Sequence, residues 1–81
     1  MCEELKSLIR DDLRPFIESA KEVFAREGDF EREDELDELL GTFDEIVLDI
    51  ENGVMEMWEC GELYEEFRRY RESGDFLDKI S

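Results

Sequence analysis

The sequence predicts an all-α protein, a small bundle of three principal helices joined by short turns. Apolar residues recur at spacings of three and four along most of the 81-residue chain, which is the period of one face of an amphipathic helix. No segment alternates between apolar and polar residues for long enough to predict a strand. The short length predicts a single acidic helical domain that spans residues 1–81.

The first helix is predicted from an apolar stripe near the start of the chain. Its residues are Leu5, Leu8, Ile9, Leu13, Phe16, Ile17, Ala20 and Phe24. Pro15 interrupts the stripe, because proline lacks a backbone N–H and is tolerated only in the first turn of a helix. We therefore expect either a kink near Arg14 or a short helix followed by a longer one, which Asp11 or Asp12 would cap. Gly28 is placed to end this helix.

The second helix is predicted over residues 31–51, with Asp29 as its cap. Its apolar residues keep the helical period for four turns: Leu36, Leu39, Leu40, Phe43, Ile46, Val47 and Ile50. Gly41 lies inside this stripe without changing its phase, which favours one unbroken helix. The alternative is a break at Gly41, after which Thr42 and Glu45 would form a capping box for a new helix.

The third helix is expected to follow a turn at residues 52–53 and to end at residues 73–75. Its near-helical pattern is carried by Val54, Met57, Trp58, Gly61, Tyr64, Phe67 and Tyr70. The aromatic residues of this set are interpreted as core side chains, and a recognition stripe on the surface is the alternative. A short C-terminal helical turn is predicted from Phe76, Leu77 and Ile80.

The net charge of −16 is concentrated in the middle of the chain. Residues 27–66 contain seventeen acids and one base, Arg32, whereas the segments on either side are nearly neutral. The second helix has four like-charge pairs at a spacing of four: Glu31 with Glu35, Glu33 with Asp37, Asp34 with Glu38, and Glu45 with Asp49. Each pair costs about 0.2–0.5 kcal/mol. Such a departure from local stability rules tends to mark a functional surface.

The residue types argue against catalysis and against a bound cofactor or metal. The chain has no histidine, which removes the common catalytic triads and the usual acid–base group. Cys2 and Cys60 lack the spacing of a zinc site, and we expect two free thiols. The acids that start at Asp29 do not form a calcium loop, because Asp34 and Leu40 stand where that loop needs glycine and glutamate.

The distribution of apolar and charged residues also limits the compartment and the class of partner. No apolar run is long enough to span a membrane, and no basic and apolar leader begins the chain. We therefore expect a cytoplasmic protein. The strong negative charge repels nucleic acids and anionic membranes, so neither is expected to bind directly.

A basic protein surface is the partner that this charge favours. The residues expected to contact it are Glu31, Asp34, Glu35, Asp37, Glu38, Asp44, Glu45 and Asp49, with Glu56 and Glu59 extending the surface. All sixteen net charges along a helix of about 32 Å give roughly one per 2 Å, close to the density of duplex DNA. In charge and size, though in no motif, the chain is similar to small acidic anti-restriction and anti-CRISPR inhibitors that imitate nucleic acid.

Two other interpretations remain open from the sequence. The chain could be an antitoxin or adaptor that binds its partner through helix packing. It could instead be a solvated acidic domain of a salt-adapted organism. A homodimer is a further option, because an apolar stripe left over on the second or third helix would allow self-association.

Overall fold

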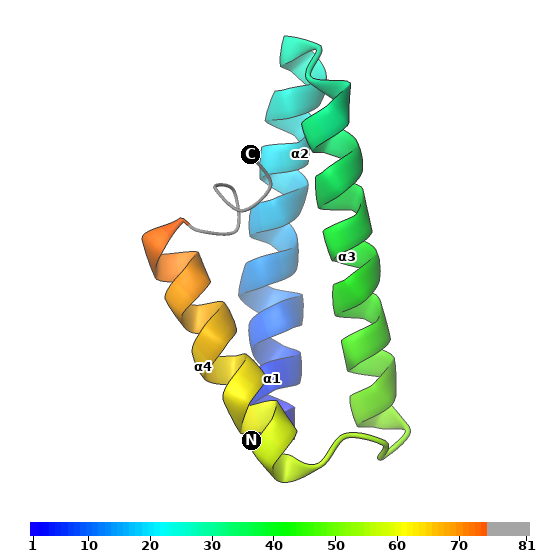
Figure 1. The fold of residues 1–81 in the computed structure, drawn as a ribbon, viewed down its shortest axis with the longest axis vertical. Coiled ribbons are helices and arrows are strands. Elements are labelled where there is room, and N and C mark those ends of the chain that lie inside the picture. Colours follow the sequence, from blue (N-terminus) through cyan, green and yellow to red (C-terminus); the bar gives the residue numbers. More distant parts are fainter. Residues whose placement is uncertain (75–81) are drawn as a thin grey trace.

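The computed structural model describes residues 1–74, and helices occupy 88% of them. The elements are α1 (Cys2–Leu8), the π-helical turn η1 (Ile9–Leu13), α2 (Arg14–Glu27), α3 (Phe30–Glu51) and α4 (Met57–Ser73). No strand occurs among these 74 residues, so the predicted all-α class is confirmed. Figure 1 shows α1, η1 and α2 stacked end to end as one long helix, with α3 and α4 packed against it.

Pro15 disturbs the first helix through its hydrogen bonds. Proline has no N–H to donate to the carbonyl of Asp11, four residues earlier. Directly before it, Ile9–Leu13 adopts the wider π pattern, and the Arg14 N–H donates to the carbonyl of Ile9, five residues back. The structure thus has a π turn just before Pro15, and no loop separates two helices here.

The second predicted helix is confirmed as a single element, α3. Asp29 caps it as predicted, since its carboxylate accepts the backbone N–H of Arg32 at 3.3 Å. The helix continues through Gly41 without interruption. The alternative break is wrong, because the Thr42 hydroxyl donates to the carbonyl of Glu38 in the preceding turn and caps no new helix.

The third predicted helix begins later than its apolar pattern indicated. The N–H of Val54 donates to the carbonyl of Asp49 at 2.9 Å, so Val54 belongs to the turn that closes α3. The first residue of α4 is Met57, and Gly74 ends the helix in the left-handed conformation, with φ of 80°. The predicted C-terminal turn at residues 76–80 lies outside the described residues.

The core forms where the three helical rods meet. Its buried side chains are Leu5, Ile9, Leu13, Ile17, Leu36, Leu40, Phe43, Cys60 and Phe67. The rings of Phe43 and Phe67 meet edge to face at 5.4 Å and join α3 to α4. Phe67 is thus a core aromatic as predicted, and Tyr64 and Tyr70 pack against the same core. Trp58 is not a core residue, because 61% of it is exposed.

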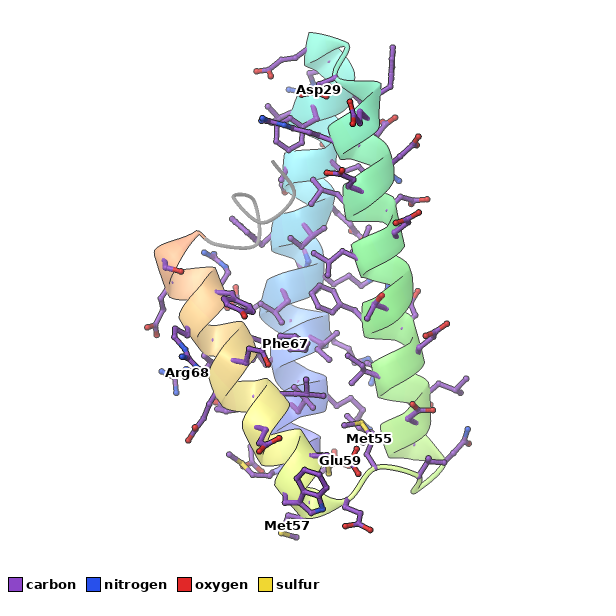
Figure 2. All side chains as sticks on the ribbon, in the orientation of Figure 1. Asp29, Met55, Met57, Glu59, Phe67 and Arg68 are labelled. Atoms are coloured by element: carbon purple, nitrogen blue, oxygen red, sulfur yellow. A yellow bond between two sulfur atoms is a disulfide. The ribbon has the colours of Figure 1, made fainter. Side chains whose placement is uncertain are left out.

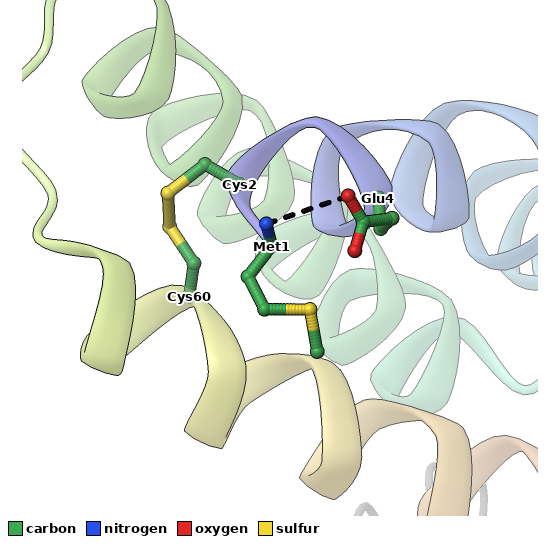
Figure 3. The surroundings of a disulfide bond; sticks show 4 residues. All are labelled: Met1, Cys2, Glu4 and Cys60. Atoms are coloured by element: carbon green, nitrogen blue, oxygen red, sulfur yellow. Dashed lines mark ion pairs between the residues drawn. A yellow bond between two sulfur atoms is a disulfide. The ribbon is translucent and has the colours of Figure 1, made fainter.

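A disulfide joins Cys2 to Cys60, so the expectation of two free thiols is wrong for this structure (Figure 3). The α-carbons of the two cysteines are 5.0 Å apart, although 58 positions separate them in the sequence. They meet because α1 and α4 both start at the same end of the molecule (Figure 1). Sequence spacing does not reveal this contact, which exists only once α4 has folded back along α1.

Candidate protein-binding face

Five of the predicted contact residues share the outward side of α3. They are Glu31, Asp34, Glu38, Glu45 and Asp49, and we call this set the acidic face. Their spacings of three, four and seven place them on one side of a helix with 3.6 residues per turn. The buried residues Leu36, Leu40 and Phe43 lie on the opposite side of the same helix. Four of the five acids are exposed and Asp49 is half-buried.

Two other predicted residues point sideways toward α2 and already have partners within the molecule. The Nζ of Lys21 donates to Oδ1 of Asp37 at 2.8 Å, and Arg14 forms an ion pair with Asp44. These pairs border a hollow of about 800 Å³ that runs along the boundary of α2 and α3. The hydrogen bond that Lys21 donates to Asp37 is the main cause that raises the pKa of Lys21 above its ordinary value of 10.5.

A sequence signal for these two ion pairs does exist. Arg14 and Lys21 stand seven residues apart on one helix, and Asp37 and Asp44 stand seven apart on the next. Seven residues are about two turns, so each pair of like charges shares a face of its helix. In an antiparallel helical hairpin the earlier base lies opposite the later acid. Arg14 accordingly pairs with Asp44, and Lys21 pairs with Asp37. Each helix considered alone leaves the two acids free for a partner, because the pairing becomes visible only when the two helices are placed in register.

The three remaining predicted residues do not extend the acidic face. Glu35 is half-buried, and its Oε2 atom is buried without a hydrogen-bond partner. Glu56 lies in the turn before α4 and accepts the Nε1–H of Trp58 at 2.6 Å. Glu59 is half-buried and lies in the first turn of α4 (Figure 2). The structure therefore does not bring all ten predicted residues onto one surface.

The acidic face contains no base. Arg32 is the only base between residues 27 and 66, and it does not lie on this face. Its guanidinium lies 5.5 Å from the centre of the Phe24 ring, and its Nε is 3.5 Å from a carboxylate oxygen of Asp29. Figure 2 shows the carboxylate oxygens projecting from the outer side of α3. In the described part of the chain no ion pair involves the five carboxylates of this face, which therefore present their negative charge to solvent.

The density of that charge is lower than the whole-helix count predicted. From Glu31 to Asp49 the helix rises about 27 Å, at 1.5 Å per residue. Five carboxylates over this length give about one per 5 Å, against one per ~3.4 Å along a single DNA strand. The difference arises because a helix distributes its side chains around its whole circumference and because Asp37 and Asp44 are neutralised by α2.

Within residues 1–74, no cluster of three or more acidic, cysteine or histidine side chains is arranged to hold a metal ion. No helix in that part of the chain combines the length and the apolar character needed to cross a membrane. The chain matches no protein-family model, no curated protein and no solved structure.

Proposed function

We propose that this chain is a non-catalytic binding module whose acidic face docks on a basic protein surface. One observation carries the proposal: five carboxylates share the outward side of α3, and no base accompanies them. The pairs Asp34–Glu38 and Glu45–Asp49 each cost about 0.2–0.5 kcal/mol of helix stability. A cationic partner relieves this repulsion on binding, and it is drawn to the face by long-range attraction.

The form of this function that we favour is inhibition of a nucleic-acid-binding protein. The positive channel of such a protein holds phosphates, and carboxylates of the acidic face would occupy part of it. Small anti-restriction and anti-CRISPR inhibitors act in this way, and the chain has their size and sign of charge. At about one charge per 5 Å, the acidic face would cover a section of the channel without reproducing a full duplex.

The first prediction compares two variants that have the same net charge. The face variant carries Asp34→Asn, Glu38→Gln, Glu45→Gln and Asp49→Asn. The control variant carries Asp11→Asn, Glu27→Gln, Glu62→Gln and Glu65→Gln, four exposed acids that lie off the acidic face. Proteins captured from the host by the parent chain are identified, purified and titrated against all three forms. We expect the face variant to bind such a partner about 10- to 100-fold more weakly, and the control variant to stay within about 3-fold of the parent.

Competition with nucleic acid separates the two forms of the proposal. If the partner's own DNA or RNA displaces the chain, and binding weakens steeply with salt, the inhibitor form is supported. If nucleic acid does not displace the chain from its partner, the inhibitor form is overturned and the chain is a protein-docking adaptor. Equal loss of binding in the face and control variants would mean that only total charge matters, which contradicts a role for the acidic face.

A second candidate is an adaptor or antitoxin that binds through apolar contacts. It is favoured by the exposed side chains of Val54, Met57 and Trp58, which lie beside the start of α4. A homodimer through an apolar stripe belongs to this candidate, and light scattering at low and high salt tests it. Like-charged copies repel each other, so a dimer should form more readily at high salt.

The cytoplasmic location expected from the sequence is part of the proposal, and the disulfide opposes it. Disulfides persist in oxidising compartments and are rare in the reducing cytosol. A cytoplasmic form of this protein would carry Cys2 and Cys60 as thiols. Alkylation of the protein in intact cells, followed by mass measurement, distinguishes the reduced pair from the bonded pair and so decides between the two kinds of compartment.

A further inference from the structure

The turn before α4 has a feature that the acidic face does not explain. Val54, Met57 and Trp58 are 66%, 72% and 61% exposed, although all three are large and apolar. Single exposed apolar residues are common, but these three lie within five positions, Val54 in the turn and Met57 and Trp58 at the start of α4, and we treat them as a patch. We call these three residues the apolar corner, and Figure 2 shows Met57 at this end of the molecule, away from the core.

We propose that the apolar corner is an anchoring point for an amphipathic basic segment of the protein partner. The partner would place an apolar side chain against Met57 and Trp58 and its Lys or Arg side chains against the surrounding carboxylates. This inference rests on the proposed function, because it specifies the chemistry of the partner that the acidic face attracts.

The Trp58 ring is held in a defined position for such contact. Its Nε1–H donates to Oε2 of Glu56 at 2.6 Å, which satisfies the polar atom of the ring within the molecule. The ring therefore offers its apolar surface without an unmet hydrogen bond. Tryptophan side chains held in this way lose little conformational freedom on binding, which is why they are frequent energetic anchors at interfaces.

Charge complementarity determines which occupant the corner accepts. Between Arg32 and Arg68 the chain contains no base, and the acids nearest to the corner in sequence are Glu51, Glu56 and Glu59. A second copy of the chain would bring the same negative charge and be repelled, and so would an anionic membrane. A basic segment gains attraction at the rim, and an arginine can also stack on the Trp58 ring.

The chain runs from the end of the acidic face into the turn that contains Val54, so a partner laid along α3 can extend toward the corner. The N–H of Val54 bonds to the carbonyl of Asp49 at 2.9 Å, and Asp49 is the last residue of the acidic face. In Figure 1 this turn runs from the end of α3 to the start of α4, whose first two residues are Met57 and Trp58. A basic helix laid along α3 would therefore reach the corner with its apolar end.

The test uses Trp58 as its own reporter, since it is the only tryptophan of the chain. The probe is a synthetic 18-residue helical peptide of lysine, arginine and leucine, and its match has serine in place of leucine. We expect the leucine peptide to shift the Trp58 emission to shorter wavelength and the serine peptide to leave it unchanged. The Val54→Ser, Met57→Ser variant keeps the reporter and should bind the leucine peptide about 10-fold more weakly.

A matched control is available at the opposite end of the molecule. Val23→Ser, Phe30→Ser removes two apolar side chains that are 46% and 64% exposed, and it should leave the affinity unchanged. Equal affinity in the corner and control variants, or no emission shift with the leucine peptide, overturns the anchoring role. The serine peptide then reports on the proposed function separately, because its binding should still fall in the face variant. If that peptide binds the face variant as well as the parent, the proposed function fails.

Discussion

Lys21 and Asp37 provide a test of the α2–α3 boundary at the scale of single residues. The hydrogen bond from Lys21 to Asp37 raises the pKa of Lys21 above 10.5, and the negative charges of Glu33 and Glu18 add to the rise. We predict that Asp37→Asn lowers the pKa of Lys21 part of the way back toward 10.5, measured by NMR titration of its side-chain carbon next to Nζ. An unchanged pKa in this variant would contradict the pairing.

The sign of the pH dependence follows from the direction of that shift. Because the folded pKa of Lys21 is higher than the unfolded value, its stabilising contribution is fully present below about pH 10.5. The contribution is lost as the pH rises through the raised folded pKa. Asp37→Asn should therefore reduce the decline in the free energy of unfolding above that pH. Asp44→Asn serves as the control, because Asp44 pairs with Arg14 and not with Lys21.

Individual acids show how far sequence reasoning reaches at this scale. The sequence correctly indicated that Asp34, Glu38 and Glu45 are exposed on α3. It did not separate them from Asp37 and Asp44, because the side of a helix that faces a neighbour depends on how the neighbour packs. Trp58 was misplaced in the core for a related reason. The apolar period continues through it, but the helix starts only one residue earlier and the first turn lies at the edge of the bundle.

At the scale of elements, the Cys2–Cys60 disulfide ties α4 to the start of α1. A closed loop of this length restricts the unfolded chain, which corresponds to about 4 kcal/mol in the chain-entropy description. We predict that Cys2→Ala, Cys60→Ala lowers the free energy of unfolding by about 2–4 kcal/mol, measured by urea denaturation. Amide exchange should accelerate most in α4, whereas α2 and α3 remain held together by Leu36, Leu40 and the charged pairs at their boundary.

Reduction of the parent protein provides the control for this disulfide prediction. Treatment with a dithiol opens the bond without changing any side chain except the two cysteines. The reduced parent should show the same acceleration in α4 as the alanine variant. Equal stability of the reduced and oxidised parent would mean that packing of α4 does not depend on the covalent link.

The helices themselves were more predictable than the links between them. The unbroken apolar phase across Gly41 identified α3 as one helix, because the apolar residues before and after this exposed glycine face the same side. Pro15 predicted a disturbance but not its form, since a missing hydrogen bond can be absorbed by a bend, a gap or a π turn. The disulfide was not predictable, because it requires the relative position of two helices that are distant in sequence.

At the scale of the whole molecule, helix packing divides the charged residues into those that pair between helices and those that face solvent on the outward side of α3. Charged residues of the first long helix pair across to α3 and α4. Arg14 pairs with Asp44 and Lys21 with Asp37 on α3, and the carboxylate of Asp12 accepts a hydrogen bond from Arg71 of α4 at 3.2 Å. The outward side of α3 receives none of these partners. The charge asymmetry was readable from composition, whereas its restriction to one face required the packing of α2 against α3.

The last prediction concerns salt, which separates a binding face from a general adaptation to saline conditions. A protein adapted to high salt unfolds in dilute buffer and gains stability steadily into molar KCl. For this chain we expect a folded bundle at 10 mM salt and a gain of less than about 2 kcal/mol in 1 M KCl, measured by urea denaturation followed by circular dichroism. The gain is small because screening weakens the repulsion along α3 and also the attraction in the cross-helix ion pairs.

The face variant tests which acids cause the gain in stability on adding salt. Removal of the Asp34–Glu38 and Glu45–Asp49 repulsions should raise stability in dilute buffer by about 0.4–1 kcal/mol and reduce the gain from added salt. The control variant, with the same net charge, should retain more of that salt-dependent gain, because its four acids lie outside the like-charge pairs of α3. An equal response of the two variants would trace the salt effect to total charge. Unfolding of the parent below about 0.1 M KCl would instead identify the acids as a salt adaptation and remove the basis for a dedicated binding face.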